Sequence, residues 1–396
     1  MSQNSGPLNY ERSLMDSVLI VAAEASSVLY AQRLIEHWKK TEKPVKCFGV
    51  GSPEMEALGF ERLGKSEEMA VVGAAEIINH FSLLKSVFDN LVIEATKRKP
   101  KVAIVMDYPE FNLMLAKKLH KLGIPVVYYI SPQVWAWRRG RVKTIKKYCK
   151  KVFLLFPFEI PFYEEHQVPN EFVGHPILDE LDDKYFNEEW VRTERQRCGI
   201  AEEEIVLGLM PGSRRLELQQ HFGIQLEVAK KLAVEVPNLK IMILVAPTFE
   251  RERLLPYLED FKLPYVIMKR EPFDMIAMTD VVLVASGTAT LMVGLLRKPM
   301  VIMYRMKPLT ALFAKLVVRG TKFFGLVNLI LGKEVSPERF QGQANPEEIF
   351  QLLVDLLRNP EKSQEQKNNL GVLVKSLGKK GATLRVAASL EEYFSK

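Results

Sequence analysis

The sequence predicts an α/β protein made of two doubly wound parallel sheets that face a common cleft. Short apolar runs rich in Val, Ile and Leu alternate with amphipathic segments, which is typical of parallel strands covered by helices on both faces. This alternation stops in a charged stretch at residues 182–204 and then starts again. A chain of 396 residues is also longer than one hydrophobic core usually organises, so two domains are expected.

The first half contains six runs with the character of buried strands. They lie at residues 17–24, 45–52, 102–108, 125–131, 151–156 and 170–175. Five more follow the charged stretch, at residues 205–213, 239–247, 265–269, 281–286 and 300–305. We therefore predict Rossmann-like domains over residues 1–190 and 191–365. Residues 366–396 are expected to be helical. Whether this segment crosses back to the first domain is left open.

Composition excludes several classes of protein. The 47% hydrophobic and 26% charged residues fit an ordinary folded chain, and no apolar run reaches the roughly eighteen residues of a membrane span. The first residues lack the basic region and apolar core of a signal peptide, so a cytosolic or peripheral protein is expected. Cys47, Cys149 and Cys198 lie far apart without metal-ligand spacing, which suggests neither a disulfide framework nor a zinc site.

Positive charge is in excess and unevenly placed. Lys and Arg outnumber Asp and Glu by 55 to 48, which suits an anionic partner. The densest basic stretch, residues 138–151, has helical spacing. This favours a solvated helix face first, a membrane or phosphate patch second, and nucleic acid last. Two weakly charged segments, 71–92 and 309–332, fit either core and interdomain packing or a lipid-facing surface.

A run of small residues follows the apolar strand that ends near residue 285. It consists of Ser286, Gly287, Thr288, Ala289 and Thr290. At the start of a helix, such residues leave backbone N–H groups accessible at the positive end of the helix dipole. The pattern is neither GxxxxGK[ST] nor GxGxxG, so a P-loop or a dinucleotide site is disfavoured. We expect a phosphate cradle, the alternative being a tight strand-to-helix connection.

A second strand-to-helix turn has similar features. In the stretch MPGSRR, Gly212 and Ser213 form the turn, and Arg214 and Arg215 add fixed positive charge at the same end of the same sheet. Two phosphate-sized sites in one cleft suggest a diphosphate ligand. Arginine suits bidentate contacts with phosphate, although one of two adjacent arginines normally points to solvent.

The first domain offers a carboxylate at the end of a strand. Asp107 follows an apolar run and precedes Pro109, where its side chain would look into the interdomain cleft. Partial burial could tune its pKa for a general base that accepts a hydroxyl proton, while the alternative role is a helix cap. His175, near the domain boundary, fits a hydrogen bond in the hinge slightly better than a phosphate contact.

Together these motifs resemble a known family. SPQVWAWRRGRVK, FPFE, FVGHP, PGSRR and SGTATL occur in that order, supported by GVGSPEMEALGF, MAVVG, DYPEFN and VNLILGKEVSPERFQ. They resemble the lipid-A-disaccharide synthases, which are glycosyltransferases of the GT-B architecture. The resemblance runs from about residue 17 to residue 345, and its SPQVWAW motif is highly specific.

The resemblance implies an activity. It is the inverting transfer of 2,3-diacylglucosamine from UDP-2,3-diacylglucosamine to the 6-hydroxyl of 2,3-diacylglucosamine 1-phosphate, with release of UDP. It further implies a reaction without metal or cofactor, at the cytoplasmic face of a Gram-negative inner membrane. The expected partners are the two lipid substrates and the membrane surface, with no nucleic acid and with oligomerisation open.

The resemblance also assigns roles to residues. Asp107 becomes the candidate general base, with Glu110 in place of a second Asp common in the family. The candidate donor contacts are Gly212, Ser213, Arg214, Ser286, Gly287, Thr288, Ala289, Thr290, Asn328 and Glu334. The candidate acceptor contacts are Glu24, Ser26 and Gln133.

Two stretches depart from the family pattern. After the first strand, Ser27, Val28, Tyr30 and Ala31 replace the family's usual Gly, Asp, His and Gly, which affects expected acceptor contacts. Met292 stands where a Glu usually accepts hydrogen bonds from the ribose. Losing these two hydrogen bonds between ribose and carboxylate costs about 1 to 3 kcal/mol, which lowers donor affinity about tenfold to a hundredfold.

These departures keep two other functions open. One is a related glycosyltransferase that joins another pair of acylated UDP-sugars. The other is a membrane-associated binding protein that kept the fold without catalysis, because fold alone does not establish function.

Overall fold

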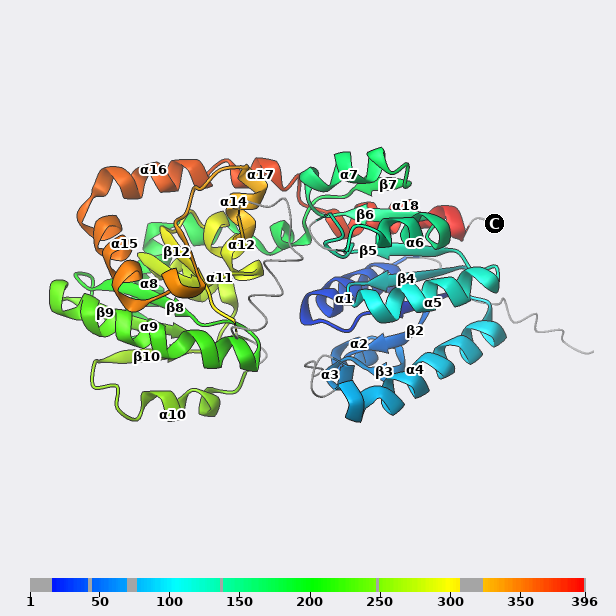
Figure 1. The fold of residues 1–396 in the computed structure, drawn as a ribbon, viewed down its shortest axis with the longest axis horizontal. Coiled ribbons are helices and arrows are strands. Elements are labelled where there is room, and N and C mark those ends of the chain that lie inside the picture. The colour runs from blue at the N-terminus through cyan, green and yellow to red at the C-terminus, as the bar shows by residue number, and fades with distance from the viewer. Residues whose placement is uncertain are drawn as a thin grey trace, which may run out of the picture.

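The computed structural model describes residues 16–41, 45–69, 77–135, 138–246, 249–306 and 323–394. They form two α/β domains, each with one parallel sheet between layers of helices (Figure 1). The first sheet has the strand order β3-β2-β1-β4-β5-β6-β7, and the second has the order β10-β9-β8-β11-β12-β13. Every pair of neighbouring strands is parallel. The predicted fold class is confirmed.

The first sheet is buried on both faces. Its strands are β1 (Ser17–Val21), β2 (Lys46–Gly51), β3 (Glu61–Lys65), β4 (Val102–Met106), β5 (Val126–Tyr129), β6 (Lys151–Leu154) and β7 (Asn170–Phe172). The helices are α1 (Ala25–Lys39), α2 (Pro53–Ala57), α3 (Ser66–Met69), α4 (Ile77–Arg98), α5 (Pro109–Lys121), α6 (Arg141–Tyr148) and α7 (Ile160–Glu165). Along β1, Leu19 and Val21 face the layer of α4 to α7, whereas Val18 and Ile20 face α1 and α2. This alternation explains the continuous apolar run.

The second sheet repeats the plan. Its strands are β8 (Ile205–Met210), β9 (Leu239–Leu244), β10 (Tyr265–Met268), β11 (Val281–Ala285), β12 (Met300–Tyr304) and β13 (Glu338–Phe340). The helices are α8 (Glu188–Arg197), α9 (Arg215–Glu235), α10 (Leu255–Leu258), α11 (Pro272–Ala277), α12 (Thr288–Leu295), α14 (Leu326–Leu331), α15 (Pro346–Arg358), α16 (Pro360–Leu370) and α17 (Leu373–Ser376). Helices α9, α10 and α15 cover one face, while α11, α12, α14 and α17 cover the other.

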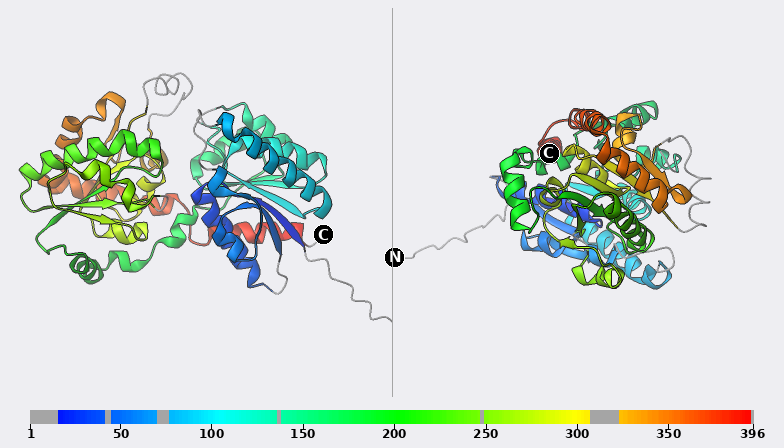
Figure 2. Two further views of the ribbon diagram at one scale, coloured as in Figure 1. Left: turned by 90° about the horizontal axis from the view of Figure 1, so that it is seen from below. Right: turned by 90° about the vertical axis from the view of Figure 1, so that its left-hand side faces the viewer.

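The chain crosses between the domains twice. The first crossing follows β7 through residues 173–181, and the second follows α17 and ends at α18 (Ala382–Leu390), which packs on α1 in the first domain (Figure 2). The backbone N–H of His175 donates to the carbonyl of Leu377 at 3.0 Å, and Arg385 Nε donates to the carbonyl of Val173 at 2.8 Å. The two crossing segments are therefore hydrogen-bonded to each other.

The predicted strands are present but shorter, because most end before the polar residues included in the prediction. Strands β3 and β13 were missed. Of the two weakly charged segments, residues 71–76 and 309–322 lie outside the described residues. The remaining parts belong mainly to α4 and α14. No described helix is both long enough and apolar enough to cross a membrane.

Candidate active site

The candidate residues lie at the switch points of the two sheets. In each sheet the strand order reverses direction between the first strand and its later neighbour, β1 beside β4 and β8 beside β11. Ligands of doubly wound sheets bind outside the carboxyl ends of strands at such points. Glu24 and Asp107 follow β1 and β4, whereas Arg214 and Ser286 lie just beyond β8 and β11. The same topology therefore places both halves of the predicted site.

An ion pair connects the two halves. Arg214 Nη2 of the second domain lies 3.6 Å from Glu24 Oε2 of the first. Both Glu24 and Arg214 also influence the pKa of Asp107. The predicted base, a predicted acceptor residue and a predicted donor residue thus come together where the domains face each other.

Asp107 has a constrained backbone. Asp107 and Tyr108 both have left-handed conformations, with φ values of 47° and 41°, which are uncommon for residues other than glycine. The Asp107 carbonyl accepts hydrogen bonds from Tyr128 Oη at 2.6 Å and from Asn112 Nδ2 at 2.7 Å. These bonds stabilise the strained turn, and strained backbone is frequent at functional sites. They use the backbone carbonyl of Asp107 and not its side-chain carboxylate.

The carboxyl group of Asp107 is tuned towards neutral pH. Burial and, to a smaller extent, the nearby Glu24 carboxylate raise its pKa from 3.8 to about 7, against the opposing effect of Arg214. A general base works best when its pKa lies near the operating pH. Asp107 therefore has the proton affinity that the predicted role requires. Glu110 instead lies exposed and forms ion pairs with Arg138 and Arg141.

The turn before α12 is open. Gly287 has a φ of 154°, and a Cβ atom added there would meet nothing within 4 Å. Ser286 Oγ donates to the carbonyl of Phe324 at 2.8 Å, and Thr290 Oγ1 donates to that of Gly287 at 2.8 Å. The first turn of a helix has N–H groups without intrahelical partners. The small residues thus leave backbone of positive polarity accessible, as a phosphate cradle requires.

The turn before α9 is filled by a side chain of its own helix. Glu217 Oε2 accepts hydrogen bonds from the backbone N–H groups of Ser213 at 2.9 Å and Arg214 at 3.2 Å. A Cβ atom at Gly212 would lie 2.5 Å from the same oxygen. The backbone N–H groups of Ser213 and Arg214 are therefore committed to Glu217, and the Arg214 side chain is the part of this motif that reaches across to the first domain.

Replacing Glu217 tests this cap. Glu217→Ala leaves two N–H groups without their carboxylate partner, so we expect a loss of about 0.5 to 2 kcal/mol in the free energy of unfolding, measured in urea. Glu227→Ala removes another glutamate of α9 and serves as the control, for which a change below about 0.5 kcal/mol is expected. Equal losses in the two variants would contradict the capping role.

Two buried polar residues of α9 support the site and were missed in the sequence. His221 Nδ1 donates to the carbonyl of Pro211 at 2.9 Å, and its Nε2 accepts from the N–H of Arg305 at 3.0 Å. Burial lowers the pKa of His221, which keeps it neutral for this pattern. Gln225 Nε2 donates to the carbonyls of Met210 and Leu283, both at 3.2 Å. The ends of three strands are thereby tied together.

The late motif forms a closed network of its own. Asn328 is buried, accepts hydrogen bonds from the N–H groups of Val335 and Ser336, and donates to the Ser336 carbonyl and to Glu338 Oε1. Asn328 therefore shapes the loop, and its amide is fully used there. Glu334 is exposed and accepts from the N–H of Glu338 at 3.3 Å.

An aromatic stack lies beside the open turn and was also missed. The Phe324 and Phe340 rings stack with centroids 4.3 Å apart, and Tyr304 stacks on Phe340 at 6.4 Å. Phe324 is 46% exposed, and its carbonyl accepts the hydrogen bond from Ser286, which places the stack beside the turn. The stack thus presents an apolar face next to the predicted phosphate cradle.

The residues that depart from the family pattern are mostly packed inside. Ser27 is buried, and its Oγ accepts a hydrogen bond from the N–H of Glu24 at 3.0 Å. Tyr30 is buried against His175 and Tyr129, with ring centroids 6.3 Å apart in each case. Met292 is partly buried against the core of the second domain. These residues therefore act mainly through packing.

His175 has the structural role favoured above. Its Nδ1 accepts a hydrogen bond from the N–H of Ile177 at 3.1 Å, and burial lowers its pKa to about 3. A neutral, buried imidazole fits the hinge rather than a phosphate contact.

Glu24 is one of the three predicted acceptor residues, and the other two lie as follows. Ser26 lies half-buried in the first turn of α1, and Gln133 is exposed beside the buried Ser131.

Comparisons with known proteins agree with this geometry. Residues 18–391 match the family model described as lipid-A-disaccharide synthetase. The chain belongs to the lipid-A-disaccharide synthase family. The synthase of Geobacter metallireducens is 35% identical over 379 residues, covering 96% of this chain and 97% of the relative. That of Trichlorobacter lovleyi is 37% identical over 370 residues, covering 93% and 95%. Members of this family are glycosyltransferases, and this chain is one of them.

Solved structures place the family member in the GT-B fold. The UDP-GlcNAc 2-epimerase of Neisseria meningitidis, solved with UDP-GlcNAc, has a TM-score of 0.62 at 13% identity and covers 95% of this chain and 100% of its own. The S. aureus MnaA-UDP co-structure has a TM-score of 0.65 at 8% identity, with coverage of 96% and 97%. At such low identities these likenesses establish the fold alone.

Proposed function

We propose that this protein transfers 2,3-diacylglucosamine from UDP-2,3-diacylglucosamine to the 6-hydroxyl of 2,3-diacylglucosamine 1-phosphate, with inversion to a β-1,6 link. The observation that carries the proposal is the position of Asp107. This carboxylate, with a pKa raised to about 7, lies near Arg214 of the facing domain. A base for the acceptor and a cation for the leaving group are thus opposed across the domains.

Each group has a defined task in the proposed reaction. The 6-hydroxyl oxygen attacks the anomeric carbon of the donor while Asp107 takes the hydroxyl proton. The bond between that carbon and the UDP oxygen breaks on the opposite face, which inverts the configuration. Arg214 and the N-terminal turn of α12 stabilise the negative charge that grows on UDP. The proton leaves Asp107 for solvent before the next cycle.

The two domains divide the substrates in this proposal. Residues 1–190 bind the acceptor and the membrane, and residues 191–365 bind the UDP-sugar. Of residues 366–396, the end of α16 and α17 pack on the second domain, and α18 returns to the first. Contacts to the donor come from Arg214 and the Ser286–Thr290 turn, and Glu24 lies on the acceptor side. The support is the switch-point location of both sets of residues and the ion pair between Glu24 and Arg214.

The enzyme is proposed to dock on the cytoplasmic face of the inner membrane through α4, α5 and α6. These helices are neighbours in the first domain (Figure 1). Phe81 on α4 is 63% exposed and Met114 on α5 is 57% exposed, which is unusual for large apolar side chains. Helix α6 adds exposed lysines, among them Lys143 and Lys147. Apolar side chains beside a basic face suit an anionic lipid surface.

Charge reversal on α6 tests the membrane surface. Each lysine near an anionic bilayer contributes about 1 kcal/mol, so Lys143→Glu/Lys147→Glu is expected to weaken binding to phosphatidylglycerol vesicles about tenfold or more in a sedimentation assay. The control Lys230→Glu/Lys262→Glu makes the same change of charge on exposed residues of the second domain. Equal weakening in both variants would show a net-charge effect and would contradict docking through α6.

The substrate pair is tested by product identity. Purified protein is incubated in detergent with the acceptor and a panel of acylated UDP-sugars, and products are identified by mass spectrometry. The proposal predicts a tetraacyl disaccharide monophosphate as the main product. Preference for another acylated sugar would instead favour a related glycosyltransferase with a different donor. That function is kept open by Met292, which stands where the family usually has a Glu.

A further inference from the structure

A cavity lies at the opposite end of the second sheet from the candidate active site. Its volume is about 570 Å³, and its lining includes Asp280 and Lys298, which precede β11 and β12. Asp107, Arg214 and the Ser286 turn all follow the carboxyl ends of strands instead. This cavity therefore belongs to another surface of the protein and takes no part in the proposed reaction.

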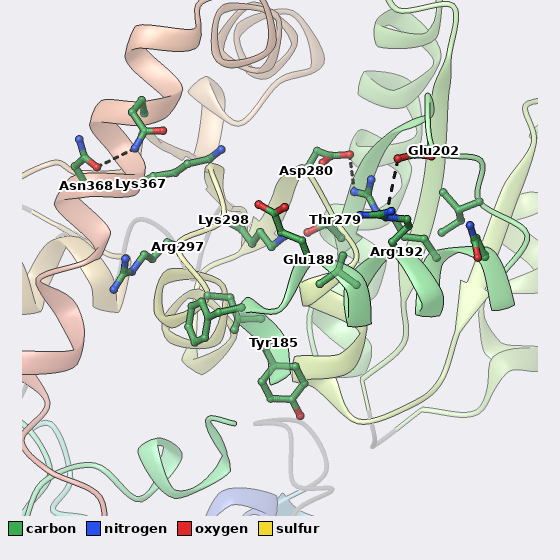
Figure 3. A pocket seen from close by; sticks show the side chains of 17 residues that line it. Tyr185, Glu188, Arg192, Glu202, Thr279, Asp280, Arg297, Lys298, Lys367 and Asn368 are labelled. Atoms are coloured by element: carbon green, nitrogen blue, oxygen red, sulfur yellow. Dashed lines mark hydrogen bonds and ion pairs between the residues drawn. The ribbon is translucent and has the colours of Figure 1, made fainter. Parts of the chain in front are cut away.

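The cavity has cationic side chains in excess of acidic ones. Two arginines are neutralised at its wall, since Arg195 pairs with Asp280 at 2.7 Å and Arg192 lies 4.0 Å from Glu202. Three further cations, Arg297, Lys298 and Lys367, share the lining with a single further acid, Glu188 (Figure 3). Within the described part of the chain, none of these three cations forms an ion pair. The lining thus has unbalanced positive charge.

The three cations come from two segments of the chain, and Lys367 and Lys298 repel each other. Lys298 follows α12, and its Nζ donates to the carbonyl of Ala277 at 2.7 Å, while Lys367 extends from α16 (Figure 3). The pKa of Lys298 is lowered to about 8, mainly by burial, with Asp280 raising it and Arg195 and Lys367 adding to the lowering. Positive groups held together in this way favour a bound anion, because an anion relieves both their repulsion and the cost of burial.

The cavity lies beside segments that lead into both crossings between the domains. Tyr185 and Phe186 in the lining come directly after the first crossing between the domains, and the helix that contains Lys367 continues through α17 into the second crossing. The amide side chains of Gln364 and Asn368 add hydrogen-bond donors on the same helix. A ligand in the cavity would touch elements attached to both crossings.

We propose that this cavity is a binding site for a small phosphate-class polyanion, separate from the donor site. Arg297, Lys298 and Lys367 contribute the charge, and the phosphoryl groups bridge the segment after α12 to α16. Arginine and lysine side chains suit phosphate oxygens. Inorganic pyrophosphate is the simplest probe, because it has the charge without a sugar or base that the active site would select.

The test compares pyrophosphate binding by calorimetry to the wild-type protein and to three variants. Arg297→Ala/Lys367→Ala removes two cations of the cavity. Lys362→Ala removes a lysine of the same helix that pairs with Asp355 at 2.6 Å and lies outside the cavity. Arg214→Ala removes the cation of the candidate active site. Thermal melts establish that every variant is folded.

We expect binding to wild type, Lys362→Ala and Arg214→Ala, and a loss of at least tenfold in affinity in the double cavity variant. Two outcomes would overturn the proposal. One is the absence of measurable binding to the wild-type protein. The other is binding whose affinity and stoichiometry are unchanged in the double cavity variant, with or without a loss in Arg214→Ala. Because no lipid substrate is used, either result is independent of the proposed catalytic function.

Discussion

Asp107→Asn is expected to lower kcat by about 10²- to 10⁴-fold, because an amide cannot accept the proton of the acceptor hydroxyl. The substitution keeps the shape of the side chain, and the left-handed turn is held through the Asp107 carbonyl by Asn112 and Tyr128, which the change leaves intact. Steady-state kinetics with both lipid substrates measure the effect. Asp260→Asn, at an exposed position of the second domain, is the control.

The pH dependence should reveal the same group. With a pKa raised to about 7, Asp107 is half ionised near that pH, so kcat/KM of the wild-type enzyme should rise with pH through about 7 and level off at higher pH. Near-normal turnover in Asp107→Asn would remove Asp107 from the mechanism.

The raised pKa has a second consequence for the same variant. The folded state binds the Asp107 proton more tightly than the unfolded state, in which the pKa is 3.8. Below pH 3.8 the group has no effect, and its destabilisation grows as the pH rises to about 7. At pH 8 Asp107→Asn should therefore be more stable than wild type, by about 1 to 3 kcal/mol, in chemical denaturation. A variant that is less active and more stable cannot owe its lost activity to misfolding.

Arg214→Ala should have the second largest effect. Its guanidinium lies 3.6 Å from Glu24 across the domains, and it is a proposed contact of the UDP-sugar. Losing a charged hydrogen-bond donor costs about 1.5 to 3 kcal/mol, so the KM for the UDP-sugar should rise roughly tenfold to a hundredfold. The pKa of Asp107 should also rise, because Arg214 now lowers it.

Arg215→Ala is the natural comparison for that variant. Arg215 is adjacent, equally charged and exposed, and it begins α9. We expect its KM for the donor to stay within about twofold of wild type, since rim charges contribute little. If the two variants raised KM equally, overall charge rather than the position of Arg214 would be responsible.

The fold was largely predictable because both sheets are buried on both faces. That burial forces continuous apolar runs, and the eleven predicted strands follow them. Strands β3 and β13 were missed because they are short edge strands with the polar sequences ERLGK and ERF. An edge strand needs only one partner and fewer apolar contacts, so its pattern is weak.

The site was predictable where it depends on strand ends. Parallel strands bring the residues after β1, β4, β8 and β11 to the switch points of the two sheets. Predicting this needs only the order of the strands. The role of Glu217 was not foreseen, although Glu217, His221 and Gln225 recur every four residues on one face of α9. That spacing is a signal for polar residues directed at a single place.

Other features depend on tertiary contacts that no local pattern contains. Asn328 was predicted to face the donor, but its hydrogen bonds close a loop with Ser336 and Glu338. Tyr30 replaces an expected polar group of the cleft and instead packs on His175 and Tyr129. The excess of cations in the cavity near the hinge arises from residues distant in sequence, so only the folded structure reveals it.

The most direct measurement is UDP release by the purified protein with UDP-2,3-diacylglucosamine, in the presence and absence of 2,3-diacylglucosamine 1-phosphate. The proposed function predicts release that depends on the acceptor, proceeds to a tetraacyl disaccharide phosphate and is lost in Asp107→Asn. Folded protein that binds both lipids but releases no UDP would contradict catalysis and would indicate a binding protein on the GT-B fold.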